Sequence, residues 1–335
     1  MDSQSNYSSL GPGFEPEASH GRIPVWVVLF VSVSLLLAVI SMLRFPKVFS
    51  EYRFYIKAEQ RMKNGETSQA LSDLMMVVEA HPDSVPMVTK LIDLSMEAGY
   101  FELAAYVFDG YLVGKDLTDS QYSRMMGYSG RLETYFSTYE IVEQLLTKSS
   151  ETEAATEEEA AAVRADVREH LSALLEDPDT DQTMLFYFMA LFSENTQERY
   201  EWLQKGYQTN PEYFDLRVQL GNTSRTLGKL DEADRYLNEA YAKDHADSGA
   251  LRGMAVLSLL KGDPASALSQ AEEAYSLYPE GDYVMDTYLI ALHVNGQTKE
   301  EGYIRAEIEN AQGALDEDTK RFLDGECTLQ EYYME

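Results

Sequence analysis

The stretch that decides the fold is FDLRVQLGNTSRTLGKLDEADRYLNEAYAKDHAD, residues 214–247. It divides at Gly228 into two segments, and each segment has the spacing of apolar residues that is typical of a helix. A glycine at this point suits the left-handed conformation in which a helix ends. Small residues, Gly221 and Ala233, stand inside the two segments and would let two helices approach each other closely. The stretch therefore predicts two antiparallel helices joined by a tight turn.

The same features return along the chain at a spacing of 34 residues. The turn glycines are Gly65, Gly99, Gly228, Gly262 and Gly296. Four of them are followed five residues later by an alanine, at Ala70, Ala104, Ala233 and Ala267. A single helix pair cannot bury its apolar face alone, so repeated pairs stack on one another. The pattern predicts an all-α chain of stacked helix pairs.

This repeat resembles that of the tetratricopeptide-repeat (TPR) family. Leu220-Gly221 stands where that family has Leu-Gly, and Ala233 with Leu237 matches its A-x-x-x-F element. The resemblance implies a right-handed α-solenoid of tetratricopeptide helix pairs. It implies two TPR units in residues 51–118, degenerate TPR-like helices in 119–213, and three TPR units in 214–315.

An uninterrupted apolar run, PVWVVLFVSVSLLLAVISML, occupies residues 24–43. As a helix it would span roughly 30 Å, which matches the hydrocarbon core of a bilayer. A buried core helix is one alternative, but the run has no amphipathic face. A cleaved signal peptide is another; the acidic residues before the run and the lack of an A-x-A-like site after it argue against cleavage. We therefore expect one transmembrane helix ahead of the solenoid.

Basic residues are unevenly distributed around this run. Only Arg22 precedes it, whereas several follow it: Arg44, Lys47, Arg53, Lys57, Arg61 and Lys63. Positively charged flanks stay in the cytoplasm. We expect a single-pass membrane protein with its repeat domain on the cytoplasmic side. The extracytoplasmic side stays open as an alternative, because basic residues on an ordinary helix surface give the same pattern.

Three segments stand apart from the repeats. Residues 1–23 are rich in Ser, Gly and Pro, and we expect them to be a disordered tail. Residues 150–160 hold a glutamate-rich insertion, which predicts an exposed loop or the start of a solvated helix. Its functional alternative is an acidic docking segment. Residues 316–335 predict a C-terminal capping segment that covers the open end of the last repeat.

The composition excludes several classes of function. The chain has 335 residues and a formal net charge of −30, so we expect no nucleic-acid partner, because phosphate binding needs clustered Lys and Arg. The single cysteine, Cys327, allows neither an intramolecular disulfide nor a cysteine-based zinc site. The histidines are scattered, and no metal motif or glycine-rich phosphate loop is present. We expect no cofactor, no metal and no enzymatic activity.

The resemblance also implies where a partner binds. In TPR proteins the first helix of each unit lines a concave groove, which takes a protein or peptide. The positions of those helices that do not face the second helix are Asp215, Val218, Asn222, Arg225, Arg252, Val256, Leu259, Asp286, Ile290 and His293. This mixture of apolar and polar groups suits an extended or helical peptide. Arg225 and Arg252 are the best candidates for charged contacts in an otherwise acidic chain.

Two hypotheses of different classes follow. The first is a scaffold or adaptor that holds an unidentified protein or peptide at the membrane, and a structural subunit of a cell-envelope or secretion complex shares its physics. The second is an enzyme subunit with its site in the irregular middle, 119–213. The repeats and the apolar run favour the first.

Overall fold

The computed structural model describes residues 25–150, 156–281 and 283–334. Its contacts divide the chain into two units, Met1–Ser50 and Glu51–Glu335. Throughout the described residues the regular structure is helical, which confirms the predicted all-α class. The predicted disordered tail, 1–23, lies outside the described residues.

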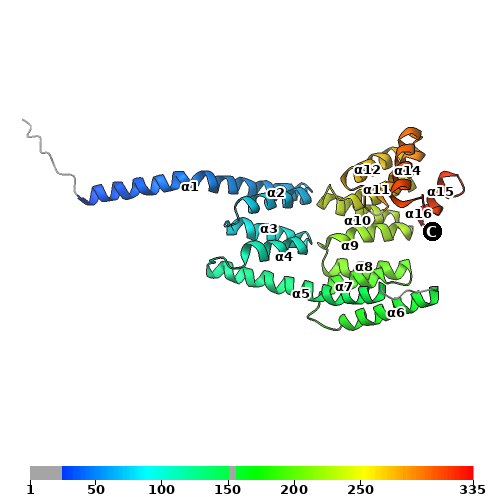
Figure 1. The fold of residues 1–335 in the computed structure, drawn as a ribbon, viewed down its shortest axis with the longest axis horizontal. Coiled ribbons are helices and arrows are strands. Elements are labelled where there is room, and N and C mark those ends of the chain that lie inside the picture. Colours follow the sequence, from blue (N-terminus) through cyan, green and yellow to red (C-terminus); the bar gives the residue numbers. More distant parts are fainter. Residues whose placement is uncertain (1–24, 151–155, 282, 335) are drawn as a thin grey trace, which may run out of the picture. The chain divides into compact units, whose positions relative to one another are not determined.

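The pair predicted from residues 214–247 is present as α9 (Phe214–Thr226) and α10 (Leu230–Lys243). Two further pairs follow and pack in chain order: α11 (Ser248–Leu260) with α12 (Pro264–Leu277), and α13 (Val284–Val294) with α14 (Thr298–Gln312). The prediction of the turns is confirmed, because all five repeat-spaced glycines have φ between +66° and +83°. Figure 1 shows these pairs in yellow-green to orange.

The first repeats use the end of a long helix. The helix α1 (Val25–Lys63) pairs through its last turns with α2 (Thr67–Ala80). The next pair is α3 (Val85–Glu97) and α4 (Phe101–Val107), and a short π-helical segment, η1 (Phe108–Leu112), continues α4. Their buried residues form one apolar core that includes Leu74, Leu91 and Ile92.

The middle of the chain is also helical but departs from the repeat length. Its helices are α5 (Asp119–Ser150), α6 (Glu157–Leu174), α7 (Gln182–Leu191) and α8 (Thr196–Thr209). The predicted acidic insertion, 150–160, runs from the last residue of α5 into the first turn of α6, and residues 151–155 lie outside the described residues. Thr156 and Glu159 form a reciprocal capping box at the start of α6. Side chains from α5 to α7 form a second core around Leu171 and Leu185.

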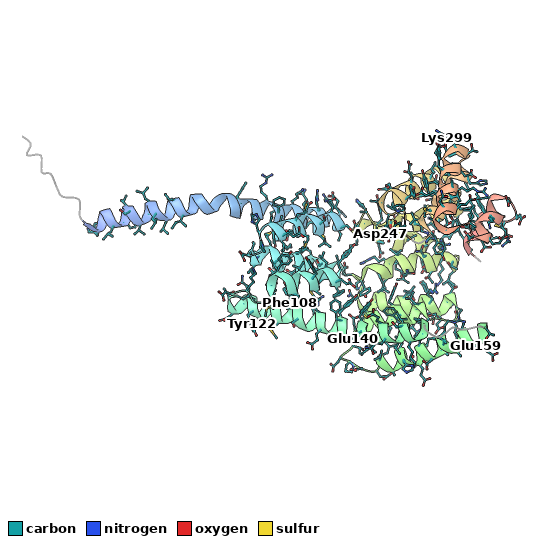
Figure 2. All side chains as sticks on the ribbon, viewed as in Figure 1. Phe108, Tyr122, Glu140, Glu159, Asp247 and Lys299 are labelled. Atoms are coloured by element: carbon teal, nitrogen blue, oxygen red, sulfur yellow. The ribbon has the colours of Figure 1, made fainter. Side chains whose placement is uncertain are left out.

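Close packing inside a pair depends on the small residues that the sequence singled out. A Cβ atom on Gly221 would lie 2.5 Å from Cγ of Leu237, so α9 and α10 meet at a distance that only glycine permits there. Neighbouring second helices are joined by tyrosine–glutamate hydrogen bonds: the Tyr207 hydroxyl donates to Glu239 over 2.8 Å, and that of Tyr275 to Glu307 over 2.7 Å. Figure 2 shows side chains filling the spaces between the paired helices.

Two segments far apart in the chain lie side by side. The backbone N–H of His245, just after α10, donates to the Gly65 carbonyl oxygen between α1 and α2, over 2.6 Å. The Ser68 amide donates to the Asp244 carboxylate over 3.1 Å, and the Thr67 hydroxyl donates to the Lys243 carbonyl oxygen. The first repeat is therefore fastened to the pair α9–α10, 176 residues later.

The predicted membrane span, 24–43, falls on the first part of α1. Among the residues that the structure describes, no helix is long and apolar enough to cross a membrane. Pro24 and the side chains of Val25, Val27, Val28 and residues 41–43 lie outside those residues, so the span at 24–43 stays a prediction.

Two short helices end the chain, α15 (Glu317–Leu323) and α16 (Leu329–Met334). They pack against each other, but α15 also contacts α13, and α16 contacts α9 and α11. These are the first helices of the last three pairs. The structure thus places residues 316–334 along the face that the first helices form, rather than at the end of the repeat array alone.

Candidate functional site

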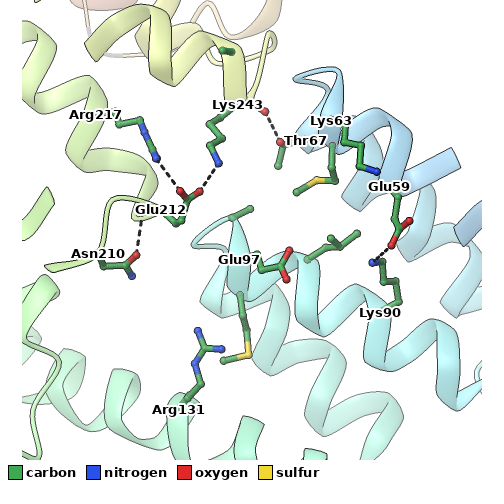
Figure 3. A pocket seen from close by; sticks show the side chains of 15 residues that line it. Glu59, Lys63, Thr67, Lys90, Glu97, Arg131, Asn210, Glu212, Arg217 and Lys243 are labelled. Atoms are coloured by element: carbon green, nitrogen blue, oxygen red, sulfur yellow. Dashed lines mark hydrogen bonds and ion pairs between the residues drawn. The ribbon is translucent and has the colours of Figure 1, made fainter. Parts of the chain in front are cut away.

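A pocket of about 880 Å³ lies between the first repeats and the pair α9–α10. This volume is within the usual range for ligand pockets. Its wall is built from the end of α1, from α2, α3 and α5, from the loop before α9, and from α9 and α10. Figure 3 shows polar side chains from these elements pointing toward a common space. The contact of Thr67 with Lys243 closes one edge of it.

Basic side chains outnumber acidic ones on this wall. The lining includes five Lys and Arg residues against three Glu residues: Lys63, Lys90, Arg131, Arg217 and Lys243, with Glu59, Glu97 and Glu212. In a chain of net charge −30 this is a local reversal of sign. A concave site with low-dielectric walls concentrates such a field and attracts groups of opposite charge.

Glu212 is held between two of these cations. Arg217 contacts its carboxylate at 3.3 Å, and Lys243 also pairs with it. Burial acts to raise the pKa of Glu212, but the hydrogen bond and charge of Lys243, with the charge of Arg217, outweigh burial and lower it. Arg217 itself is only 5% exposed, so its guanidinium is fixed in direction.

On the opposite wall, Lys90 pairs with Glu59 at 2.8 Å and lies over the ring of Tyr55. The hydrogen bond from Lys90 is the main cause that lowers the pKa of Glu59. Two other cations of the wall, Lys63 and Arg131, are exposed and form no ion pair with any residue that the structure describes. Both are labelled in Figure 3 and remain available to an external anion.

The pocket also has an apolar part. Met62, Leu94 and Met96 line it between the charged groups, and Leu94 and Met96 are buried. Methionine is flexible and polarizable, which lets one surface fit several apolar shapes. The arrangement can hold a segment that combines carboxylates with a few apolar side chains.

The predicted groove residues lie elsewhere, on α9, α11 and α13. Val218 and Asn222 are half-buried, and the side chain of Asp215 lies outside the described residues. On α11, Val256 and Leu259 are buried, and so are Asp286 and Ile290 on α13. The structure brings most of these residues together, but it does not leave them open to solvent.

The chain's own C-terminal segment covers this groove. Leu259 and Ile290 belong to an apolar cluster with Phe322, Leu329 and Tyr332. One of the predicted charged contacts is covered as well, because Arg225 donates to the carbonyl oxygen of Tyr333. The other, Arg252, donates to the carbonyl oxygen of Tyr283, just before α13, over 3.3 Å. His293 meets the ring of Phe322 at 5.8 Å.

Burial changes the titration of the groove's charged groups. Arg225 is 8% exposed, and desolvation by burial lowers its pKa to about 10. Burial, with the nearby charge of Asp316, raises the pKa of Asp286.

Metal sites are a separate question. No metal-binding cluster of three or more His, Cys, Asp or Glu is present among the described residues. Asp181, one of the three aspartates of residues 177–181, caps α7 by accepting from the Met184 amide.

Sequence reasoning did not find the pocket residues. They come from five separate parts of the chain, and the contact between the α1–α2 turn and the end of α10 brings the first and the last of these parts together. Only the composition of the chain could have pointed to a basic pocket. Basic residues are few in this chain, and a TPR-like array gathers side chains on its concave face.

No known protein family matches this sequence, and no curated protein matches it. Among solved structures, the chain is similar to a tetratricopeptide repeat protein from Parabacteroides merdae ATCC 43184. The identity is 15% and the TM-score 0.38, over 85% of this chain and 99% of that one.

Two other solved structures show a comparable similarity. The Rap conjugation gene regulator of plasmid pLS20, solved with the Phr* peptide, has 16% identity and a TM-score of 0.41, over 85% of this chain and 80% of that one. YrrB, a TPR protein with an unusual peptide-binding site, has 17% identity and a TM-score of 0.32, over 67% and 97%. With identities and TM-scores this low, these similarities carry no argument about what this chain binds. Its repeat architecture rests on its own helices.

Proposed function

We propose that this chain is a helical-repeat scaffold that binds an acidic segment of a partner protein in the pocket between the first repeats and α9–α10. The observation that carries the proposal is the charge of the pocket, whose wall is basic in a strongly acidic chain. Repulsion by the rest of the surface keeps acidic partners away from other sites, so the pocket is where such a partner is attracted.

The form of the pocket favours a protein segment over a small metabolite. Its lining spans about 180 residues of chain, from Glu59 to Lys243, and alternates charged with apolar groups. Arg217 and Lys90 are held by ion pairs, while Lys63 and Arg131 are exposed. The two paired cations can orient a bound carboxylate, and the two exposed side chains can adapt to the spacing of carboxylates along a peptide.

We further propose that α1 anchors this scaffold in a membrane. Support comes from the apolar run and from the exposure of its side chains: Trp26 is 70% exposed, and Phe30 and Leu35 are 69% and 61% exposed. A large exposed apolar surface marks an interaction site, and its length suits a bilayer. The basic flank from Arg44 to Lys63 favours a cytoplasmic repeat domain. Protease added to right-side-out vesicles should then leave this domain intact, and its digestion before lysis would contradict this orientation.

The pocket is tested by charge reversal in the full-length chain in detergent. The probe is a panel of fluorescent 12-residue peptides rich in Asp and Glu with two leucines, each matched with a Lys-rich counterpart. We expect acidic peptides to bind, and binding to weaken as salt screens the charges. The double variant Lys63→Glu/Arg131→Glu should weaken binding at least tenfold.

The matched control is Lys299→Glu/Arg305→Glu on α14, which changes the net charge equally outside the pocket. It should bind like the wild type. Equal loss in both double variants would show that net charge, and not the pocket, governs binding. Preference for the Lys-rich peptides would contradict the proposed partner class.

A structural subunit of a larger complex is the second candidate. It is favoured by the same exposed apolar helix, because that surface could pack against other membrane helices as well as lipid. A structural subunit would bind its neighbours independently of Lys63 and Arg131.

A further inference from the structure

The C-terminal segment lies in the groove as a bound peptide would. Helix α16 packs across α9 and α11, and α15 contacts α13. Leu329, Tyr332 and Tyr333 contact the apolar cluster of Leu259 and Ile290. An amphipathic helix laid into an apolar groove is a common mode of peptide recognition.

The C-terminal segment also forms polar contacts with the groove, as a bound peptide would. The guanidinium of Arg225, on α9, donates to the main-chain carbonyl of Tyr333 and lies 5.8 Å from the centre of its ring. The hydroxyl of Tyr332 lies 2.8 Å from that of Thr319, which ties α16 to α15. The adjacent tyrosines therefore supply both the apolar and the polar part of the contact.

The fit is incomplete. Among the described residues, three buried polar atoms of the groove have no hydrogen-bond partner: Nε of Arg225, Oδ1 of Asn222 and Oδ1 of Asp286. A buried polar atom without a partner lowers the stability of the arrangement that buries it. An occupant that satisfied them would bind more tightly than the chain's own segment.

The segment is weakly held together by itself. Its helices contain seven and six residues, and isolated helices this short are unstable in water. Gly325, with φ of +75°, separates them, and α16 is held in place by its contacts with α15 and with the groove. The helical conformation of the segment therefore depends on its contacts with the groove.

We infer that residues 325–334 are an intramolecular ligand of the groove, and that the groove's external partner is a short helical segment with two adjacent aromatic residues. The chain's own segment competes with that partner. This inference goes beyond the proposed function, since it concerns a second surface that shares no residue with the basic pocket. A partner protein that binds the groove must first displace α16. Its apparent affinity is therefore the intrinsic affinity multiplied by the fraction of molecules in which α16 has left the groove.

The test uses a fluorescent synthetic peptide of residues 325–334 with Cys327→Ser, and a full chain that ends at Asp324. We expect the shortened chain to bind the peptide with at least tenfold higher affinity than the intact chain. A peptide with both tyrosines replaced by serine should not bind.

Matched substitutions locate the contact. In the shortened chain Arg225→Gln should weaken peptide binding at least fivefold, whereas Arg235→Gln, on the exposed side of α10, should leave it unchanged. Lys63→Glu/Arg131→Glu should also leave it unchanged, so failure here is distinguishable from failure of the basic pocket.

If the shortened chain loses its helical circular dichroism, the full-length variant Tyr333→Ser replaces it, because this change loosens α16 without removing it. It should bind the peptide more tightly than the wild type. Folded protein of either kind that shows no binding of the peptide at millimolar concentration would overturn the inference and leave α16 as a structural element.

Discussion

Gly221 shows how far a single residue can be read from sequence. The repeat pattern predicts a small residue there, and the structure shows why: a Cβ would meet Leu237 at 2.5 Å and 2.7 Å. A larger residue at position 221 would force α10 to shift or Leu237 into a strained conformation. What the pattern could not supply is the identity of the opposing side chain, which depends on how the two helices are rotated.

We predict that Gly221→Ala lowers the free energy of unfolding by about 1–3 kcal/mol, because overpacking a tight helix contact costs this much. The matched control is Gly302→Ala on α14, where nothing lies within 4 Å of the new methyl group. The control should stabilise the helix by up to about 1 kcal/mol, since alanine is the better helix former. Urea unfolding measures both, and equal effects would show that α9 and α10 do not meet at this point.

Asp73 on α2 provides a test by pH. It is 8% exposed and pairs with Arg61 at 2.5 Å and Lys57 at 3.0 Å. Burial acts to raise the pKa of Asp73, but hydrogen bonds from Lys57 and Gln69 and the charge of Arg61 lower it overall. A lowered pKa stabilises the fold above the unfolded-state value of about 3.9, and this stabilisation is lost as pH falls through the folded-state value.

Asp73→Asn should therefore lower the free energy of unfolding by about 1.5–3 kcal/mol near neutral pH, the usual scale for a hydrogen bond to a charged group. The difference from the wild type should shrink as the pH falls below about 4. Chemical denaturation over a series of pH values measures it. A difference that stays constant down to about pH 2.5 would mean that the carboxylate charge does not stabilise α2.

At the scale of elements, local helix pairs could be predicted and distant contacts could not. The turn glycines at a spacing of 34 residues mark the turns between α9 and α10, between α11 and α12, and between α13 and α14. The contact of the α1–α2 turn with the end of α10 depends on the cumulative rotation of all the pairs between them, which no local pattern encodes. The position of α16 in the groove is a long-range contact of the same kind.

Asp244 is the residue that fastens these two distant elements. It is buried, and it accepts hydrogen bonds from the amide and hydroxyl of Ser68 and from the amide of Ala246 over 3.1 Å. Asp244→Ala removes the acceptor of these hydrogen bonds and with it the link between the two elements. We predict faster hydrogen exchange at residues 65–68 in this variant. Unchanged exchange there would show that the first repeat is held by other contacts.

At the scale of the whole molecule, the apolar run before the repeats predicts an integral-membrane protein. Carbonate extraction of membranes should leave the full-length chain in the pellet. A chain without residues 1–45 should appear in the supernatant, because the compact unit Glu51–Glu335 lies wholly beyond the deletion. Recovery of the intact chain in the carbonate wash would contradict membrane anchoring.

The basic pocket is the central claim of this account, and hydrogen exchange with a bound acidic peptide tests it most directly. The pocket is lined from α3, from the loop that holds Asn210 and Glu212, and from the end of α10. We predict that the peptide slows exchange in these three segments and leaves α12 and α14 unchanged. Slower exchange confined to α11, α13 and α16, with none at residues 210–217, would contradict the claim and assign the acidic partner to the groove.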